Sequence, residues 1–279
     1  MYSINCRGKL IDLSRPKVMG ILNISPDSFF DGGKYNSEES VISQVNKMIH
    51  EGATFIDVGA ISSRPGATPV PEERELELLL PVIKLLMLEF PEIVISVDTT
   101  RASVARKAIQ LGASLINDIS AGSADVTMFD TIAELQVPYI MMHMQGRPEN
   151  MQDAPTYNDI VSEILKYFSA KLETLRQKGV HDIISDVGFG FGKSLHHNYQ
   201  LLKHLNLFQQ LEIPTLVGLS RKSMLYKPLK IDPREALNST TSANTIALYQ
   251  GANILRVHDV KEAIEAIKIF ELTYKTPNE

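Results

Sequence analysis

Short apolar runs alternate with longer amphipathic segments along the whole chain. The runs are rich in Val, Ile and Leu and are apolar at consecutive positions, which is typical of parallel strands covered by helices on their outer side. They predict strands at 18–23, 54–59, 93–98, 114–118, 138–143, 182–186, 214–219 and 253–257. The segments between them predict helices at 38–51, 72–90, 101–111, 126–135, 157–178, 198–211, 234–250 and 260–274.

Eight strand–helix repeats in one α/β chain predict a single (β/α)8 TIM barrel. Asn36 and Glu39 match a capping box at the start of the first helix, and four helices are followed by a glycine that stops them: Gly52, Gly112, Gly179 and Gly251. We expect one domain over residues 1–279, with an N-terminal hairpin at 1–14 plugging the bottom of a barrel at 15–275. A doubly wound open sheet is the alternative, but no feature of the sequence marks its change of direction.

Composition narrows the classes of partner. The net charge of −5 and the pI of about 5.8 provide no basic stripe for a nucleic acid. Cys6 is the one cysteine, which excludes a disulfide within the chain and fits a reducing compartment. The N-terminus lacks a signal-peptide pattern, and the apolar runs are shorter than the roughly 18 residues of a spanning helix. We therefore expect a soluble cytoplasmic protein without a membrane or nucleic-acid partner.

Every predicted strand ends in polar residues. These are Asn23, Asp57, Asp98, Asn117 with Asp118, His143, Asp186, Ser220 to Lys222, and Arg256 with His258. In such barrels the carboxyl ends of the strands form the active site, and burying unpaired polar groups costs a few kcal/mol each. The pattern predicts a polar ligand at the mouth.

The residue types indicate what that ligand is. Asp98, Asn117 and Asp186 suit a flat heterocycle with a guanidine-like edge, because a carboxylate accepts two parallel N–H bonds. A set of cations indicates a separate anionic portion, a phosphate or diphosphate: Arg64, Arg221, Lys222, Arg256 and His258. Asn23 is a neutral oxygen ligand of the kind that Mg²⁺ accepts.

The glycine-rich stretch VGFGFGKS at 187–194 is not a phosphate-binding loop of the G-x-x-x-x-G-K-[ST] type, because Val187 occupies the first glycine position. We interpret it as a tight turn that allows close backbone approach to a ligand. Phe191 could then present its ring to a second substrate.

Taken together, the motifs resemble the dihydropteroate synthase family over about residues 18–260. They are NISPDSFFDGG (23–33), SSRPGA (62–67), SVDT (96–99), NDIS (117–120), MHMQG (142–146), DVGFGFGK (186–193), GLSRKS (218–223) and RVHDV (256–260). The resemblance implies condensation of a dihydropterin methyl diphosphate with 4-aminobenzoate, giving dihydropteroate and diphosphate for folate biosynthesis. It also implies a homodimer formed through late helices, for which 237–248 is apolar enough.

Site roles follow from the same resemblance. The pterin is expected to bind Asp98, Asn117, Asp186 and Lys222, and the diphosphate to contact Ser63, Arg256 and His258. Asn23 is the expected Mg²⁺ ligand. The 4-aminobenzoate is expected to contact Phe29, Pro65, Phe191 and Ser223, while Asp31 and Arg64 help to stabilise the leaving diphosphate. The catalytic set is therefore Asp31, Arg64, Lys222, Arg256 and His258.

Departures and rivals remain. Ala60, Ile61 and Val187 differ from the family pattern. We interpret His143 as a satisfied histidine of the barrel mouth, Asp57 and Asp118 as partners of neighbouring loops, and His196 with His197 as a solvated helix start. The alternatives are a barrel that passes a methyl group from a reduced folate to a corrinoid protein, and a pterin-binding protein without activity. The first needs neither SRPGA nor SRKS, and the second needs no Asn23, Arg64, Arg256 or His258.

Overall fold

The computed structural model describes residues 2–24, 34–60, 70–146, 151 and 155–274. Eight parallel strands close into a barrel in the order β10-β3-β4-β5-β6-β7-β8-β9. Their bounds are β3 Lys17–Asn23, β4 Phe55–Gly59, β5 Val94–Asp98, β6 Leu115–Asp118, β7 Tyr139–Met142, β8 Ile183–Asp186, β9 Thr215–Val217 and β10 Ile254–Val257. The predicted barrel is confirmed, and the open sheet is excluded.

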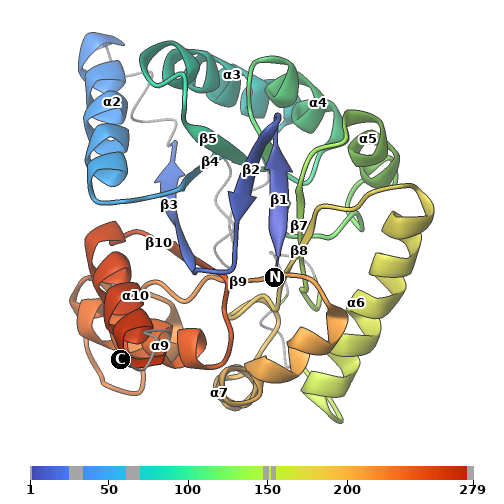
Figure 1. Cartoon of the computed structure of the whole chain (residues 1–279), viewed down its shortest axis with the longest axis vertical. Coiled ribbons are helices and arrows are strands. Elements are labelled where there is room, and N and C mark those ends of the chain that lie inside the picture. The colour runs from blue at the N-terminus through green and yellow to red at the C-terminus, as the bar shows by residue number, and fades with distance from the viewer. Residues whose placement is uncertain (1, 25–33, 61–69, 147–150, 152–154, 275–279) are drawn as a thin grey trace.

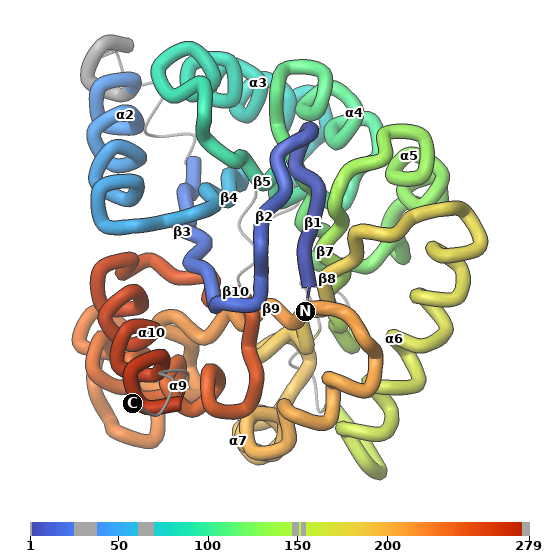
Figure 2. The backbone as a smooth tube through the Cα atoms, in the orientation of Figure 1, coloured from blue at the N-terminus to red at the C-terminus, as the bar shows by residue number. Residues whose placement is uncertain are grey.

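Helices surround this barrel as a ring (Figures 1 and 2). They are α2 Lys34–His50, α3 Glu72–Glu89, α4 Ala102–Gln110, α5 Met128–Leu135, α6 Ile160–Gln177, α7 Leu195–Lys203, α8 Ser223–Tyr226, α9 Leu237–Tyr249 and α10 Val260–Tyr274, with 3₁₀ turns η1 Leu205–Leu211 and η2 Pro233–Glu235. The four stop glycines all adopt positive φ, between 78° and 116°. Left-handed backbone of this kind favours glycine, so the predicted helix ends are confirmed.

Four helix predictions were wrong at their starts by three or more residues: those of α2, α6, α7 and α9. Helix α2 begins at Lys34, so Asn36 lies inside it and is not its N-cap. The segment 198–211 divides into α7 and η1, and α7 begins after Ser194, whose side chain caps it together with His197. Asp232 with Glu235 caps η2, which precedes α9. Histidine at the third position is not the usual capping-box residue, which hid the start of α7.

The lower part of the barrel is filled by one apolar residue from every strand. These are Met19, Phe55, Val94, Leu115, Ile140, Ile184, Leu216 and Ile254. The N-terminal hairpin, β1 Ser3–Cys6 and β2 Lys9–Asp12, lies across this end of the barrel (Figure 1) and adds Ile4, Cys6, Ile11 and Leu13 to the same cluster. The predicted plug is confirmed. Burial raises the pKa of the Cys6 thiol to about 12, so this cysteine is not reactive.

Side chains alternate inward and outward along a strand. Residues two and four positions after the apolar layer therefore also face the barrel interior, but they lie nearer the carboxyl ends of the strands. Parallel pairing aligns Asn23 with Gly59, Gly59 with Asp98, and Asp98 with Asn117. One layer below, Asp57 is paired with Ser96. The barrel thus places the polar strand ends together at one rim.

Candidate active site

A chain of polar side chains crosses one side of the rim. The Arg256 guanidinium donates from Nε to Asp57 Oδ2 at 2.6 Å and from Nη2 to Asp98 Oδ2 at 2.8 Å. Asn117 donates from Nδ2 to the same Asp57 oxygen at 3.0 Å. Asp57 is fully buried, and its Oδ1 has no hydrogen-bond partner within the described part of the chain. Four strands are therefore joined by one network that centres on Asp57 and the half-buried Arg256.

Burial sets the electrostatics of this group. Removal from water raises the pKa of Asp98 to about 7; Arg256 opposes the shift, and the neighbouring carboxylates of Asp57, Asp118 and Glu75 add to it. Although burial disfavours its charge, Asp57 and Asp98 raise the pKa of Arg256 above its ordinary value. The guanidinium stays charged while Asp98 can gain or lose a proton near neutral pH.

Asp186 and Lys222 form the opposite side of the rim. Asp186 accepts a hydrogen bond from the Gly188 amide at 2.8 Å. A methyl group built on Gly218 would lie 3.9 Å from Lys222 Nζ and 4.0 Å from Asp186 Oδ2, so both polar groups lie over that bare backbone. Burial raises the pKa of Asp186 and lowers that of Lys222 to about 8. This half of the rim therefore places a carboxylate and an amine beside a backbone position that has no side chain.

The Lys222 amine also touches the glycine-rich segment 187–194. Its Nζ donates to the Phe189 carbonyl and lies 4.7 Å from the centre of the Phe191 ring. Phe191 is half-buried, and so is Ser223, the first residue of α8. The structure thus brings together three predicted site residues: Asp186 at the end of β8, and Phe191 and Lys222 on the loops after β8 and β9.

The glycine-rich segment is a tight turn, as predicted, but its close approach is to the backbone that follows β7. Gly188, Gly190 and Gly192 have φ of 68°, 84° and 61°. A Cβ on Gly188 would lie 2.0 Å from the His143 oxygen, and one on Gly192 would lie 2.3 Å from the Gln145 oxygen. The glycines are therefore required by contact between two loops of the protein itself.

The two cationic side chains that follow β9 and β10, Arg221 and His258, have different partners. His258 is exposed, and its Nδ1 lies 2.9 Å from Ser220 Oγ, which also accepts from the His258 amide. Arg221 donates from Nε and Nη2 to the two oxygens of Asp259, at 2.9 and 2.8 Å. The Arg221 guanidinium is thus paired within the protein, and the expectation that it faces an anionic ligand stays a prediction.

The other side chains singled out in the sequence lie in different surroundings. His143 is buried and bonded to Lys193, and Asp118 accepts from Ser120, Gly122 and Tyr139, so their structural interpretation is confirmed. His197 belongs to the start of α7, as predicted. Asp57 is different: it bonds Arg256 and Asn117 inside the barrel, so its interpretation as a loop partner was wrong. Phe29, Asp31, Ser63, Arg64, Pro65 and the departure at Ile61 lie outside the described residues.

The described side chains at the rim offer few ligands for a metal ion. Among the described residues, no group of three or more His, Cys, Asp or Glu could hold a metal ion. Asn23 ends β3 with an exposed side chain, in register with Gly59 beside Asp98. A neutral amide oxygen in this position fits Mg²⁺ only if substrate and water supply the other ligands.

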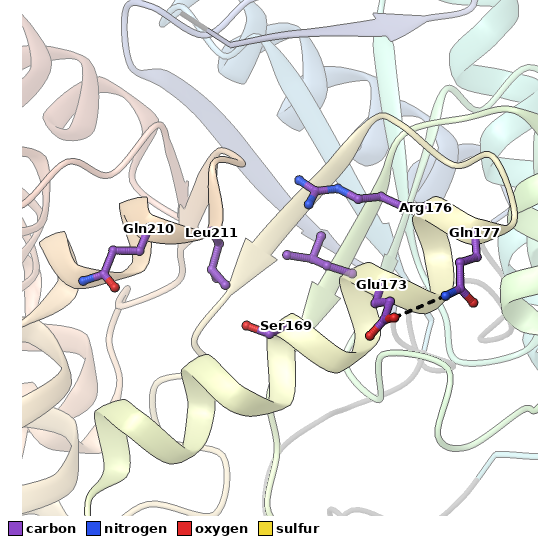
Figure 3. Close-up of a pocket in the computed structure, with 7 residues that line it drawn as sticks. Ser169, Glu173, Arg176, Gln177, Gln210 and Leu211 are labelled. Carbon is purple, nitrogen blue, oxygen red and sulfur yellow. Dashed lines mark hydrogen bonds between the residues drawn. The ribbon is translucent and has the colours of Figure 1, made fainter.

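A separate surface groove of about 470 Å³ lies outside the barrel between α6 and η1 (Figure 3). Its lining includes Glu173, which accepts a hydrogen bond from Gln177 at 3.3 Å, and Leu211 on the opposite wall. It contains none of the predicted site residues. Within the described ranges, no helix is long and apolar enough to cross a membrane.

Comparison with known proteins decides the family. The family model for pterin binding enzymes matches residues 19–258. The chain is 45% identical over 269 residues to dihydropteroate synthase of Escherichia coli K12, covering 96% of this chain and 95% of that protein. It belongs to the dihydropteroate synthase family.

Other members agree over nearly the full length. The Bacillus subtilis dihydropteroate synthase is 39% identical, with 91% of this chain and 87% of that protein covered. A Yersinia pestis dihydropteroate synthase in complex with a sulfonamide drug has a TM-score of 0.92 at 42% identity, covering 99% of this chain and all of that one. The Xanthomonas albilineans dihydropteroate synthase with 4-aminobenzoic acid has a TM-score of 0.90 at 37% identity, covering 99% of both chains.

Proposed function

We propose that this dihydropteroate synthase family member condenses (7,8-dihydropterin-6-yl)methyl diphosphate with 4-aminobenzoate. The arylamine nitrogen forms a bond to the pterin methylene carbon, the C–O bond to diphosphate breaks, and the amine loses a proton. The observation that carries the proposal is the rim itself, where the buried Asn117 and Asp186 and the half-buried Asp98 lie with Arg256 and Lys222 at the carboxyl ends of the strands. These groups match a heterocycle joined to an anion.

The pterin is held by the acidic and amide side chains. Asp186 and Lys222 lie beside the bare backbone of Gly218, where a Cβ would meet no heavy atom closer than 3.9 Å. Their carboxylate and amine present an acceptor and a donor to the ring edge. Asp98 and Asn117, adjacent in register, serve the other edge. Anionic carboxylates also stabilise the positive charge that grows on the pterin as the C–O bond breaks.

Cationic side chains bind the leaving diphosphate, and Asn23 would hold the Mg²⁺ ion beside it. Arg256 and His258 are on β10 and just after it, and Lys222 follows β9. Asn23 would hold Mg²⁺, which supplies positive charge to the diphosphate oxygens when bound. A neutral arylamine is already nucleophilic, so the chain needs to orient it rather than to deprotonate it. Phe191 and Ser223 border the side of the rim from which we expect it to enter.

The proposal is tested by diphosphate release. The purified chain is incubated with pterin diphosphate and Mg²⁺, with and without 4-aminobenzoate, and dihydropteroate is quantified in parallel. We expect equal amounts of diphosphate and dihydropteroate, and only when the arylamine is present. Release without the arylamine, or binding of the pterin without release, would contradict the proposal and favour hydrolysis or the non-catalytic alternative. Methyl transfer from a reduced folate to a corrinoid would support the methyltransferase alternative.

We further propose a homodimer formed through α9 and α10. Apolar side chains are exposed on these adjoining helices: Ile246, Tyr249, Ile269, Leu272 and Tyr274. The Tyr249 and Tyr274 rings lie 5.4 Å apart, which joins the two helices into one apolar surface. Light scattering should report twice the 31.1 kDa chain mass for the wild type and a shift towards the chain mass for Ile269→Glu. A wild-type monomer at micromolar concentration would contradict the proposal.

A further inference from the structure

Lys193 is a buried lysine for which the proposed reaction has no direct use. It is 2% exposed. Its Nζ lies 3.1 Å from both Nδ1 and the carbonyl oxygen of His143, and donates to the Phe191 carbonyl at 2.9 Å. One side-chain nitrogen therefore joins the end of the glycine-rich segment 187–194 to the backbone just beyond β7.

Other contacts fix the same segment from three sides. Tyr157 donates to the Gly192 carbonyl at 2.8 Å, and the Gly190 amide donates to Asn198 Oδ1 at 2.7 Å. Asn198 also donates to the Lys193 carbonyl at 3.3 Å. The bare Gly188 and Gly192 backbones lie directly against the loop that follows β7. Every glycine of the turn is held in place, although glycine backbone is the most easily deformed.

The glycine-rich segment includes one predicted site residue, Phe191, and contacts another, Lys222. The carbonyl that Lys193 binds belongs to Phe191, whose ring lies against the Lys222 amine. Lys222 in turn bonds the carbonyl of Phe189 on the same segment. A shift of the turn by a fraction of an ångström would therefore move the Phe191 ring and the Lys222 amine together.

We propose that Lys193 is a positioning residue that holds the Phe191 ring beside the Lys222 amine for the reaction with the arylamine. It touches no substrate and acts through the Phe191 carbonyl. The assignment rests on the proposed function, since the arylamine reaction is its readout. Misplacing a positioned group by about 1 Å typically costs about 100-fold in rate, so loss of Lys193 should be visible in kcat/KM.

The test is a double-mutant cycle between Lys193→Met and Phe191→Ala. Methionine keeps the length of the buried chain and removes its N–H groups. In the wild-type background, Lys193→Met should lower kcat/KM for 4-aminobenzoate by about 10- to 100-fold. In the Phe191→Ala background the same change should cost less than about threefold, because the group that Lys193 positions is gone. Lys203→Met, on the exposed end of α7, is the control and should match wild type.

Hydrogen exchange gives a second readout without substrates. Peptides covering 186–194 should exchange faster in Lys193→Met, while peptides from α3 on the other side of the barrel should not. An equal loss of kcat/KM in both backgrounds, or no loss in either, would overturn the proposal. If Lys193→Met does not fold, the cycle is run with Tyr157→Phe, which removes only the bond to Gly192 and should show the same coupling with about a three- to tenfold effect. A wild-type chain without arylamine-dependent diphosphate release would instead refute the proposed function.

Discussion

At the scale of single residues, the guanidinium of Arg256 lies between the carboxylates of Asp57 and Asp98. From the sequence, Arg256 is predicted to be a cation that binds the diphosphate. The sequence cannot show that two carboxylates flank its guanidinium. The structure shows that Arg256 also neutralises buried charge, which costs several kcal/mol when unpaired. Its removal should therefore affect both activity and stability.

We predict that Arg256→Ala slows turnover by about 10²- to 10³-fold, the usual cost of losing one preorganised charge-stabilising group. It should also lower the free energy of unfolding by about 3 to 5 kcal/mol, because Asp57 is left buried without its cation. Urea unfolding and steady-state kinetics measure the two effects. Arg256→Ala with Asp57→Asn should regain most of the stability but none of the turnover. Recovery of turnover in the double variant would show that Arg256 has no part in the chemistry.

The shifted pKa values predict a narrow pH optimum. Burial raises the pKa of Asp98 to about 7, so Asp98 gains a proton and loses its negative charge as the pH falls through that value. Burial lowers the pKa of Lys222 to about 8, so Lys222 loses its positive charge as the pH rises through that value. With both charged forms required, kcat/KM for the pterin diphosphate should be highest between about pH 7 and 8.

Single variants identify the two limbs of the profile. Asp98→Asn should remove the acid limb and Lys222→Met the alkaline limb, each at lower overall activity. Ratios of variant to wild type at each pH cancel the titration of the diphosphate itself. Limbs that persist in both variants would show that other groups, or the substrate, set the profile.

At the scale of elements, two loops meet because glycine allows them to. A Cβ on Gly188 would collide with the His143 oxygen, whereas one on Gly179, which also has positive φ, would meet no heavy atom within 4 Å. The glycine spacing in the sequence indicates a tight turn but cannot show what approaches it. Lys193 was missed for the same reason: only the fold reveals that two of its three contacts are with His143 on another loop.

This pair of glycines provides a matched test. Gly179→Ala should cost about 1 to 2 kcal/mol, the strain of a side chain in left-handed backbone. Gly188→Ala should cost about 2 to 5 kcal/mol, since overpacking against the strand end adds to that strain. Thermal and urea unfolding measure both variants. Gly188→Ala should also lower kcat/KM, as Asp186 accepts its hydrogen bond from that residue. Equal losses in stability would contradict the close contact.

At the scale of the whole molecule, the barrel and its plug could be predicted from the sequence. Continuous apolar strands, regular helices and four stop glycines leave few other folds, and the polar strand ends locate the mouth. Charge pairing could not be predicted. Arg221 lies in the loop after β9 and pairs with Asp259, whereas Arg256 lies within β10 and pairs with Asp57 inside the barrel. Spacing along the chain does not distinguish these outcomes, because they depend on which way each side chain points.

The most direct measurement for the central claim is a crystal structure of this chain with a bound dihydropterin. We expect a flat ring over Gly218, with its edges within hydrogen-bonding distance of Asp186, Lys222, Asp98 and Asn117, and its methyl substituent directed towards Arg256. A ring bound at another surface of the molecule, such as the groove between α6 and η1, or seated at the rim without contact to Asp186, would contradict it.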